Sequence, residues 1–250
     1  MKPSVKCYAT GHQHSNVIMA AFSQGCNGQI VPPNRLLDGP AAFYGILRGT
    51  GELLKQCEWI GRDYYYLDHG YFKPGHYEGH YRVTKNGRQA DIPDPREKIF
   101  PDDRWRKLNL ELKPWRKNGK NVVIIPLTGA IGAFYGIQPD KWLDLVTHEI
   151  SRHTDRPIIV KQKTEGSIVD YFGDCWCLVT HSSNSAADAL LAGIPVVTLG
   201  ESACETVSWT PENIETPWWP ERELWAHALA YQQFSLNEMR EGTAWRLLER

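Results

Sequence analysis

The sequence predicts an α/β protein of two lobes. Short apolar runs typical of buried strands alternate with helical periodicity in residues 5–31, and the same alternation returns in residues 121–199. Between these regions, residues 88–119 are rich in proline and charge and show little apolar periodicity, which is typical of a connection. We therefore expect two Rossmann-like lobes that face a cleft, an N-terminal one of residues 1–87 and a C-terminal one of residues 120–250.

The composition indicates an ordinary globular protein. Of the 250 residues, 42% are hydrophobic and 23% are charged, and the formal net charge of −1 offers no basic field that would attract nucleic acid. No apolar run approaches the roughly 18 residues needed to cross a bilayer, and the first residues lack the apolar segment of a signal peptide. We therefore expect a cytoplasmic protein without a membrane span. The six cysteines form no C-x-x-C pair and are expected to be reduced thiols.

The first lobe begins with a strand, a polar turn, a helix and a second strand. Val5–Thr10 is the first strand, the helix carries apolar residues at helical spacing up to Gly25, and Gln29–Val31 starts the second strand. The turn holds His12 and His14 just beyond the carboxyl end of a strand, where open α/β sheets bind ligands. We expect His12 to face a substrate; the alternative is two solvated turn histidines. Their H-x-H spacing suits a metal, but no third ligand is evident nearby.

A helical region is expected next. Asp38 is a good N-cap residue and Pro40 a good first helical residue, so together they predict a helix over residues 41–47. Residues 49–51 carry two glycines and are expected to form a bend. The sequence then predicts a further helix over residues 52–59.

The next predicted strand ends in an acid and a histidine. Residues 63–67 are rich in strand formers, and Asp68 and His69 follow at the carboxyl end, before a permissive Gly70. Asp68 is the leading candidate for a general base, and the alternative is a structural acid that bonds loop amides. Both interpretations stay open. The loop of residues 75–81 is rich in histidine and aromatic residues and too polar for a core.

The second lobe opens with the same pattern. Asn121–Leu127 is typical of a buried strand, and Thr128 and Gly129 begin a loop of small residues where a phosphate could approach the backbone. Pro139 then starts an amphipathic helix, and residues 157–160 form the next strand.

The segment Thr180–Gly200 is the most informative part of the chain. A short buried strand, a polar turn, a helix that ends at Gly193 and a further strand follow one another. Backbone N–H groups, hydroxyl groups and the positive end of the helix dipole converge at the turn, which indicates a site for an anion such as phosphate. The expected ligands are Ser182, Ser183 and Asn184. The alternative is that the serines merely cap a helix.

Further elements follow. Glu201 comes after a strand, where an acid could accept a hydrogen bond from a ribose hydroxyl. Residues 208–220 are rich in tryptophan and proline and are expected to form an ordered loop. A helix is expected over residues 221–233, and Ser235 opens a capping box for a final helix that runs through Leu248.

At the serine-rich turn and the helix A-x-x-A-L-x-A-G-x-P-V, the sequence resembles the nucleotide-sugar domain of glycosyltransferases with the GT-B fold, including capsule-polysaccharide transferases. The resemblance covers roughly residues 120–205. It implies that the turn holds the donor diphosphate, that Lys161 and Lys163 meet the donor phosphates from one face of a strand end, and that the last helices pack back on the first lobe. The family usually shows arginine and histidine with proline at the positions of the two lysines. The whole chain is also similar to proteins of tailed phages.

These resemblances imply a glycosyltransferase that moves a sugar from a nucleotide-diphospho-sugar, expected to be a UDP-sugar, to an acceptor hydroxyl. The expected donor ligands are Ser182, Ser183, Asn184, Thr128, Gly129, Lys161, Lys163 and Glu201. In the first lobe Asp68 would be the base, with His69, Asp38 and His12 in reserve. The phage resemblance suggests hydroxymethylated pyrimidines in DNA as one acceptor class.

Missing motifs narrow the alternatives. The sequence has no G-x-G-x-x-G for a dinucleotide and no P-loop, and its strand ends carry no D-x-D for a metal, so a metal-independent site without a separate cofactor is expected. Two other hypotheses remain. One is a protein that binds a nucleotide or modified nucleoside without catalysis, and the other is an epimerase-like enzyme acting on nucleotide-sugars.

Overall fold

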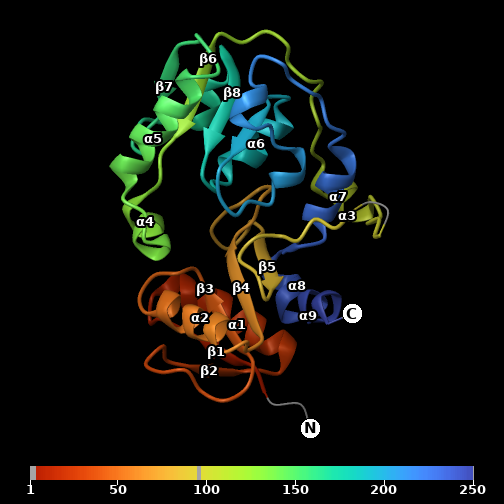
Figure 1. Cartoon of the computed structure of the whole chain (residues 1–250). Helices are drawn as coiled ribbons and strands as arrows, with labels where there is room; N and C mark the ends of the chain where they lie inside the picture. Colours follow the sequence, from red (N-terminus) through yellow and green to blue (C-terminus); the bar gives the residue numbers. More distant parts are fainter. Residues whose placement is uncertain (1–3, 95–96, 250) are drawn as a thin grey trace. The chain divides into compact units, whose positions relative to one another are not determined.

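The structure is a computed structural model that describes residues 4–94 and 97–249 (Figure 1). These residues form two units. The first runs up to Pro93 and takes in the chain from Ala228 onwards, and the second runs from Asp94 to His227. Of the connection that the sequence suggested over residues 88–119, residues 88–93 therefore belong to the first unit and residues 97–119 to the second, whereas the C-terminal helices belong to the first.

In the described part of the chain, the first unit is built on a six-stranded sheet in the order β10–β5–β4–β3–β1–β2. Strands β1 to β4 are parallel, and β5 pairs antiparallel with both β4 and β10. The strands are β1 (Lys6–Tyr8), β2 (Gln29–Val31), β3 (Ala41–Tyr44), β4 (Tyr64–His69), β5 (Tyr81–Lys85) and β10 (Gln233–Phe234). The helices are α1 (Gln13–Cys26), α2 (Thr50–Trp59), α8 (Leu236–Arg240) and α9 (Thr243–Leu248).

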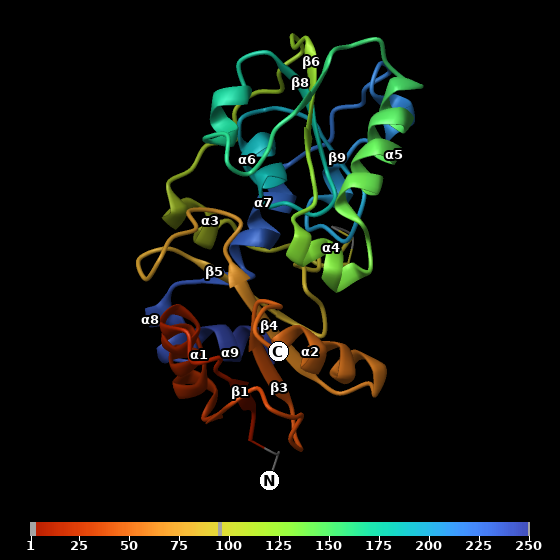
Figure 2. The same cartoon turned by 90° about the vertical axis from the view of Figure 1, so that its left-hand side faces the viewer.

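Helices α1 and α2 cover opposite faces of this sheet (Figure 2). A strand covered on both faces is expected to be continuously apolar, and residues 64–67 of β4 are all less than 5% exposed. Under α1, alternate residues of the central strands meet the buried side of the helix, which includes Ile18 and Phe22. Residues of α8 and α9 complete the same core, so this unit is assembled from both ends of the chain.

The predicted helix over residues 41–47 is wrong, because residues 41–44 form the central strand β3. Ala41, Ala42 and Phe43 are completely buried between β1 and β4, with both of which β3 pairs in parallel. Helix propensity is a weak preference that such burial overrides. Asp38 consequently caps no helix: it precedes the amino end of β3, and its side chain is fully exposed, 3.6 Å from Arg62.

The second unit has a parallel sheet of four strands within the described ranges, in the order β7–β6–β8–β9. The strands are β6 (Asn121–Ile125), β7 (Ile158–Val160), β8 (Cys175–Thr180) and β9 (Val196–Thr198). The helices are α3 (Asp103–Leu108), α4 (Gly129–Tyr135), α5 (Pro139–Ser151), α6 (Ser185–Leu191) and α7 (Glu223–Ala230), the last of which crosses into the first unit. Short 3₁₀ helices are η1 (Ile168–Tyr171), η2 (Glu205–Val207) and η3 (Pro211–Asn213).

Helices α5 and α6 lie on opposite faces of the second sheet (Figure 1, Figure 2). The apolar side of α5, with Trp142, Val146 and Ile150, packs on Val122 and Ile124 of β6. The periodicity placed Leu145 on the same side, which is wrong, because Leu145 is 70% exposed. The small-residue loop expected after β6 is instead the start of a helix, because the Thr128 hydroxyl accepts a hydrogen bond from the Ile131 N–H and caps α4.

The predicted capping box at Ser235 is confirmed, since its hydroxyl accepts from the Glu238 N–H and the Glu238 side chain accepts from the Ser235 N–H. The single final helix was wrong. The chain breaks between α8 and α9 at Gly242, which has a φ of 75°. None of the helices among the described residues combines the length and apolar character needed to cross a membrane.

Replacing Gly25 by alanine should destabilise the first unit. A Cβ atom there would lie 1.9 Å from the Met239 carbonyl oxygen on α8, so the helices must separate. Because alanine also favours the helix, we expect a net loss of about 2 kcal/mol in the free energy of unfolding, measured with urea. The matched control is Gly87→Ala in the same unit, whose new Cβ would make only an ordinary contact of 3.6 Å. Equal stability of the two variants would contradict the close approach of α1 and α8.

Candidate functional site

In each sheet the parallel strands have a point where the strand order reverses, and ligands of open α/β sheets bind there at the carboxyl ends of the strands. In the first unit the chain passes from β1 to β2 on one side and then to β3 on the other. In the second unit it passes from β6 to β7 and then back to β8 on the far side of β6. A ligand is therefore expected at the ends of β1 and β3 in the first unit, and at the ends of β6 and β8 in the second.

In the second unit, the predicted polar turn follows β8 directly. Ser182 Oγ lies 3.0 Å from His181 Nδ1. Ser183 Oγ accepts from the Ser185 N–H at 3.2 Å and donates to the Ser185 hydroxyl at the same distance. The two serines are half-buried, and Asn184 occupies the N-cap position of α6 without making a side-chain capping bond. The turn thus holds hydroxyl groups at the strand end, and the Ser183 hydroxyl also accepts from the first N–H of α6.

His181 is a member of this site that the sequence did not single out. Its ring is 6% exposed and packs against Tyr135 of α4 and Trp142 of α5, with ring centroids 5.0 and 6.2 Å away. A Cβ on Gly200 would lie 2.2 Å from the ring, so only glycine fits beside it. Burial lowers the pKa of His181, which keeps the imidazole neutral near pH 7. The sequence could have indicated His181, because it directly follows a buried strand.

Other predicted donor ligands gather around the same end of the sheet. The Tyr135 hydroxyl donates to Glu201 Oε2 at 3.3 Å, so the Tyr135 side chain links α4 to the residues that follow β9. Thr128 and Gly129 start α4 after β6, and the space where a Gly129 side chain would stand is open. The carboxyl ends of the parallel strands β6, β8 and β9 therefore lie at the same edge of the sheet.

The two lysines do not share a strand face, because β7 ends at Val160. Lys161 is 6% exposed, and its ammonium group donates to the carbonyl oxygens of Gln162 and Gly166 at 2.9 and 2.8 Å. These bonds give Lys161 a structural role in its own loop. Lys163 is exposed in the same loop. The resemblance suggested phosphate contacts for both, and the geometry leaves only Lys163 available for them.

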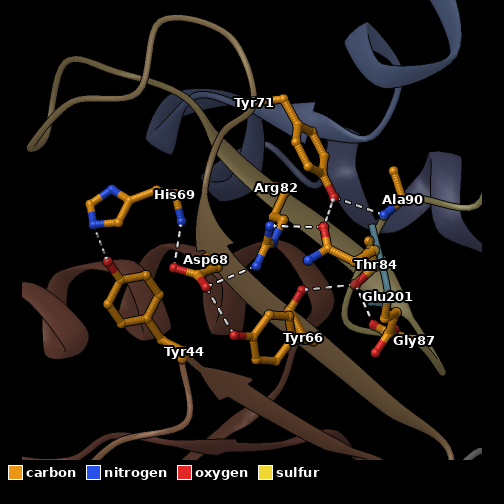
Figure 3. Close-up of polar contacts among 12 residues, drawn as sticks. Tyr44, Tyr66, Asp68, His69, Tyr71, Arg82, Thr84, Gly87, Ala90 and Glu201 are labelled. Carbon is orange, nitrogen blue, oxygen red and sulfur yellow. Dashed lines mark hydrogen bonds and ion pairs between the residues drawn. The ribbon is translucent and has the colours of Figure 1, made fainter. Parts of the chain in front are cut away.

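In the first unit, Asp68 belongs to a polar network on β4 and β5 (Figure 3). Its Oδ2 accepts from Arg82 Nη2 at 3.0 Å and from the Tyr66 hydroxyl at 2.9 Å, and its Oδ1 accepts from the His69 N–H at 2.8 Å. Arg82 is only 6% exposed. Burial and the neighbouring Asp68 carboxylate raise the pKa of Tyr66. Both carboxylate oxygens are thus engaged, which favours the structural interpretation of Asp68 over the general base.

A histidine cluster lies at the strand ends of the same unit. We define it as His14, His69, His76, Tyr44 and Tyr81. Tyr44 ends β3, His69 ends β4, and His14 stands in the first turn of α1 after β1. His14 Nδ1 lies 3.3 Å from His76 Nδ1, and its Nε2 lies 3.4 Å from the Tyr81 hydroxyl. His69 Nε2 lies 3.4 Å from the Tyr44 hydroxyl.

The cluster combines a buried imidazole with an exposed one. His14 is 6% exposed, and burial, with the neighbouring histidines His76, His69 and His12, lowers its pKa from the ordinary 6.5. His76 is exposed, and its Nε2 has no hydrogen-bond partner in the part of the chain that the structure describes. The exposed imidazole of His76, which contacts the buried and neutral imidazole of His14, is suited to proton transfer.

His12, the histidine that the sequence favoured, occupies the N-cap position of α1 and is exposed without capping it. His12 was preferred to His14, although the spacing of His14 from apolar residues of the same helix could have identified it as buried. His14, Ile18 and Phe22 are four residues apart along α1, and all three are buried. His76 gave no comparable signal, since it lies in a loop whose path depends on the rest of the unit.

Comparisons with known proteins bear on the fold. No family model matches the sequence, and no curated protein matches it. Among solved structures, the chain is similar to two KpsC transferases of Thermosulfurimonas dismutans. The beta Kdo 2,4 transferase matches with a TM-score of 0.55 and 12% identity, over 98% of either chain. The beta Kdo 2,7 transferase matches with a TM-score of 0.56 and 13% identity, over 99% of either chain. The fold is therefore GT-B-like over its full length, in agreement with the predicted fold class.

Proposed function

We propose that the protein is a glycosyltransferase that moves a sugar from a nucleotide-activated donor to an acceptor hydroxyl. The observation that carries the proposal is the full-length likeness in fold to two Kdo transferases. The chemistry at the strand ends supports it, because hydroxyl groups gather in the second unit and imidazoles in the first. Transfer needs both kinds of group, one for the leaving phosphate and one for the acceptor proton.

We assign the donor to the second unit. The bond between the anomeric carbon and the phosphate oxygen breaks, and negative charge grows on the leaving nucleotide, where hydroxyl and N–H donors stabilise it. We assign this role to Ser182, Ser183, Thr128 and the backbone N–H of Gly129, and we take Asn184 and the exposed Lys163 as further candidates. Glu201 is the candidate partner of a ribose hydroxyl. A UDP-sugar is the first donor to test, and nucleotide-activated Kdo is the second.

We assign proton transfer to His76. The acceptor oxygen bonds to the anomeric carbon and its proton passes to His76 Nε2, the exposed ring nitrogen. For Nε2 to accept, the proton of neutral His76 must reside on Nδ1 and point at His14 Nδ1, 3.3 Å away. His14 can accept it if its own proton is on Nε2, directed at the Tyr81 oxygen. The lowered pKa of His14 favours this neutral form.

Nucleotide binding to the second unit provides the first test. Nucleoside diphosphates should raise the melting temperature of the wild type, since a ligand that binds only the folded state stabilises it. Ser183→Asp should abolish the shift, because a carboxylate would stand where the phosphate binds. The control Leu145→Asp adds the same charge to the same unit on the exposed side of α5, where Leu145 is 70% exposed, and should keep the shift. An unchanged shift in Ser183→Asp would place the nucleotide elsewhere.

The rival proposal is a protein that binds a nucleotide without catalysis. The two proposals predict different fates for the donor. A transferase releases free nucleotide faster when the acceptor is supplied, whereas a binding protein returns the donor intact. The acceptor panel should contain simple sugars, Kdo-bearing glycans and DNA with hydroxymethylated pyrimidines, the class that the phage resemblance suggested. Donor that remains intact with every acceptor would favour the binding protein.

A further inference from the structure

Three side chains of the second unit bring potential metal ligands together. Within the described residues, ligand atoms of Glu149, His153 and Glu212 all lie within 4.8 Å of one another. Glu149 lies in the last turn of α5, His153 lies in the turn just after this helix, and His153 Nε2 lies 2.9 Å from Glu149 Oε1. Glu212 comes from η3, which follows β9 much later in the chain.

We propose that Glu149, His153 and Glu212 form a binding site for a divalent cation of the zinc class. An imidazole nitrogen with two carboxylate oxygens suits Zn²⁺ better than Ca²⁺ or Mg²⁺, which prefer oxygen ligands. Three protein ligands leave the fourth tetrahedral position to water. Zinc bonds of about 2 Å would require Glu149 Oε1 and His153 Nε2 to separate slightly, so the ion replaces their hydrogen bond.

The surroundings are compatible with such an ion. Arg152 pairs with Glu149 Oε2 at 3.0 Å, which leaves Oε1 for the metal and orients the carboxylate. The Glu149 and His153 side chains are 39% and 22% exposed, and Glu212 is exposed, so the site is open to solvent. An open hollow of about 580 Å³, lined by residues 151–156 and Glu215, adjoins His153 and provides an entry path.

The site is separate from the proposed donor site. Because α5 returns the chain from the carboxyl end of β6 to the amino end of β7, its last turn lies at the amino ends of the parallel strands. The residues assigned to the donor lie at the carboxyl ends. A bound ion would therefore cross-link α5 to the segment that carries η3, without taking part in sugar transfer.

The test measures zinc binding to the folded protein. Melting experiments are unsuitable alone, because unfolding exposes six thiols that also bind zinc. We would titrate the native protein with Zn²⁺ against a chromophoric chelator and expect one equivalent bound to the wild type. His153→Gln and Glu212→Gln should each weaken binding by at least about 100-fold, more than the loss of an outer partner costs. Glu212 is exposed, so its replacement is not expected to impair folding.

The matched control is His148→Gln, which removes a neighbouring histidine from the same helix and should leave zinc affinity unchanged. Co²⁺ should show the visible absorption of a tetrahedral site in the wild type and lose it in Glu212→Gln. Absence of a stoichiometric site in the wild type, or full affinity in both ligand variants, would overturn the proposal. Nucleotide-induced stabilisation in the presence of EDTA tests the donor site independently, so the two proposals can fail separately.

Discussion

His76→Gln is expected to lower sugar transfer by about 10²–10⁴-fold, the usual loss when a general base is removed. Glutamine keeps much of the size of the side chain but cannot take a proton from the acceptor. Because His76 is exposed in a loop, the variant should fold normally. The nucleotide-induced shift in melting temperature should stay at the wild-type value, because the donor is assigned to the second unit.

His12→Gln is the comparison for this experiment. Both histidines are exposed in the first unit, but His12 stands at the N-cap of α1 with no side-chain capping bond. We expect His12→Gln to transfer sugar within a few-fold of the wild type. The reverse pattern, activity lost with His12 and kept with His76, would reject the histidine cluster and return the role to the residue that the sequence favoured.

Asp68→Asn is expected to destabilise the first unit by about 3 kcal/mol, because it leaves the buried Arg82 guanidinium without that carboxylate. This loss of stability is at the low end of the range for breaking a buried ion pair, since the Asp68 side chain is 29% exposed. Urea unfolding measures the loss. Asp63→Asn is the control, because Asp63 is exposed and its carboxylate accepts a hydrogen bond from the side-chain amide of Asn86, which carries no charge, so the effect should stay below about 1 kcal/mol.

This experiment also decides between the two interpretations of Asp68. A structural acid predicts lost stability, with the remaining folded protein still able to transfer sugar well below its melting temperature. Wild-type stability with transfer abolished would instead make Asp68 the general base, and His76 would lose that assignment.

The second unit was easier to predict than the first. From β8 to β9 the chain forms a strand, a turn, a helix and a strand within a few residues of the expected bounds, because each boundary carries a local signal such as Gly193 or the serines. The first unit depends on contacts between distant segments. Strand β3 is defined by its neighbours on both sides, and helix propensity within residues 41–47 pointed the other way.

The candidate sites show the same division. Serine hydroxyls at a strand end could be found from the sequence, because the ligands are adjacent in the chain. The histidine cluster could not, since His14 and His76 meet only after α1 and the loop before β5 have folded onto one sheet. The hydrogen bonds of Lys161 to the carbonyl groups of its own loop also depend on the folded structure. The sequence shows only that a lysine is present, not what its ammonium group binds.

The place of the last residues in the first unit has a consequence for synthesis on the ribosome. Strand β10 pairs with β5, and Leu236, Met239 and Ala244 fill the core beneath α1. A nascent chain of which only residues 1–93 have been synthesised lacks these groups, so Phe22 and Tyr65 are missing some of their packing partners. The second unit, which is continuous in sequence, can complete its core earlier. We expect the unit that is made first to finish folding last, and to rely on chaperones until the C-terminal helices emerge.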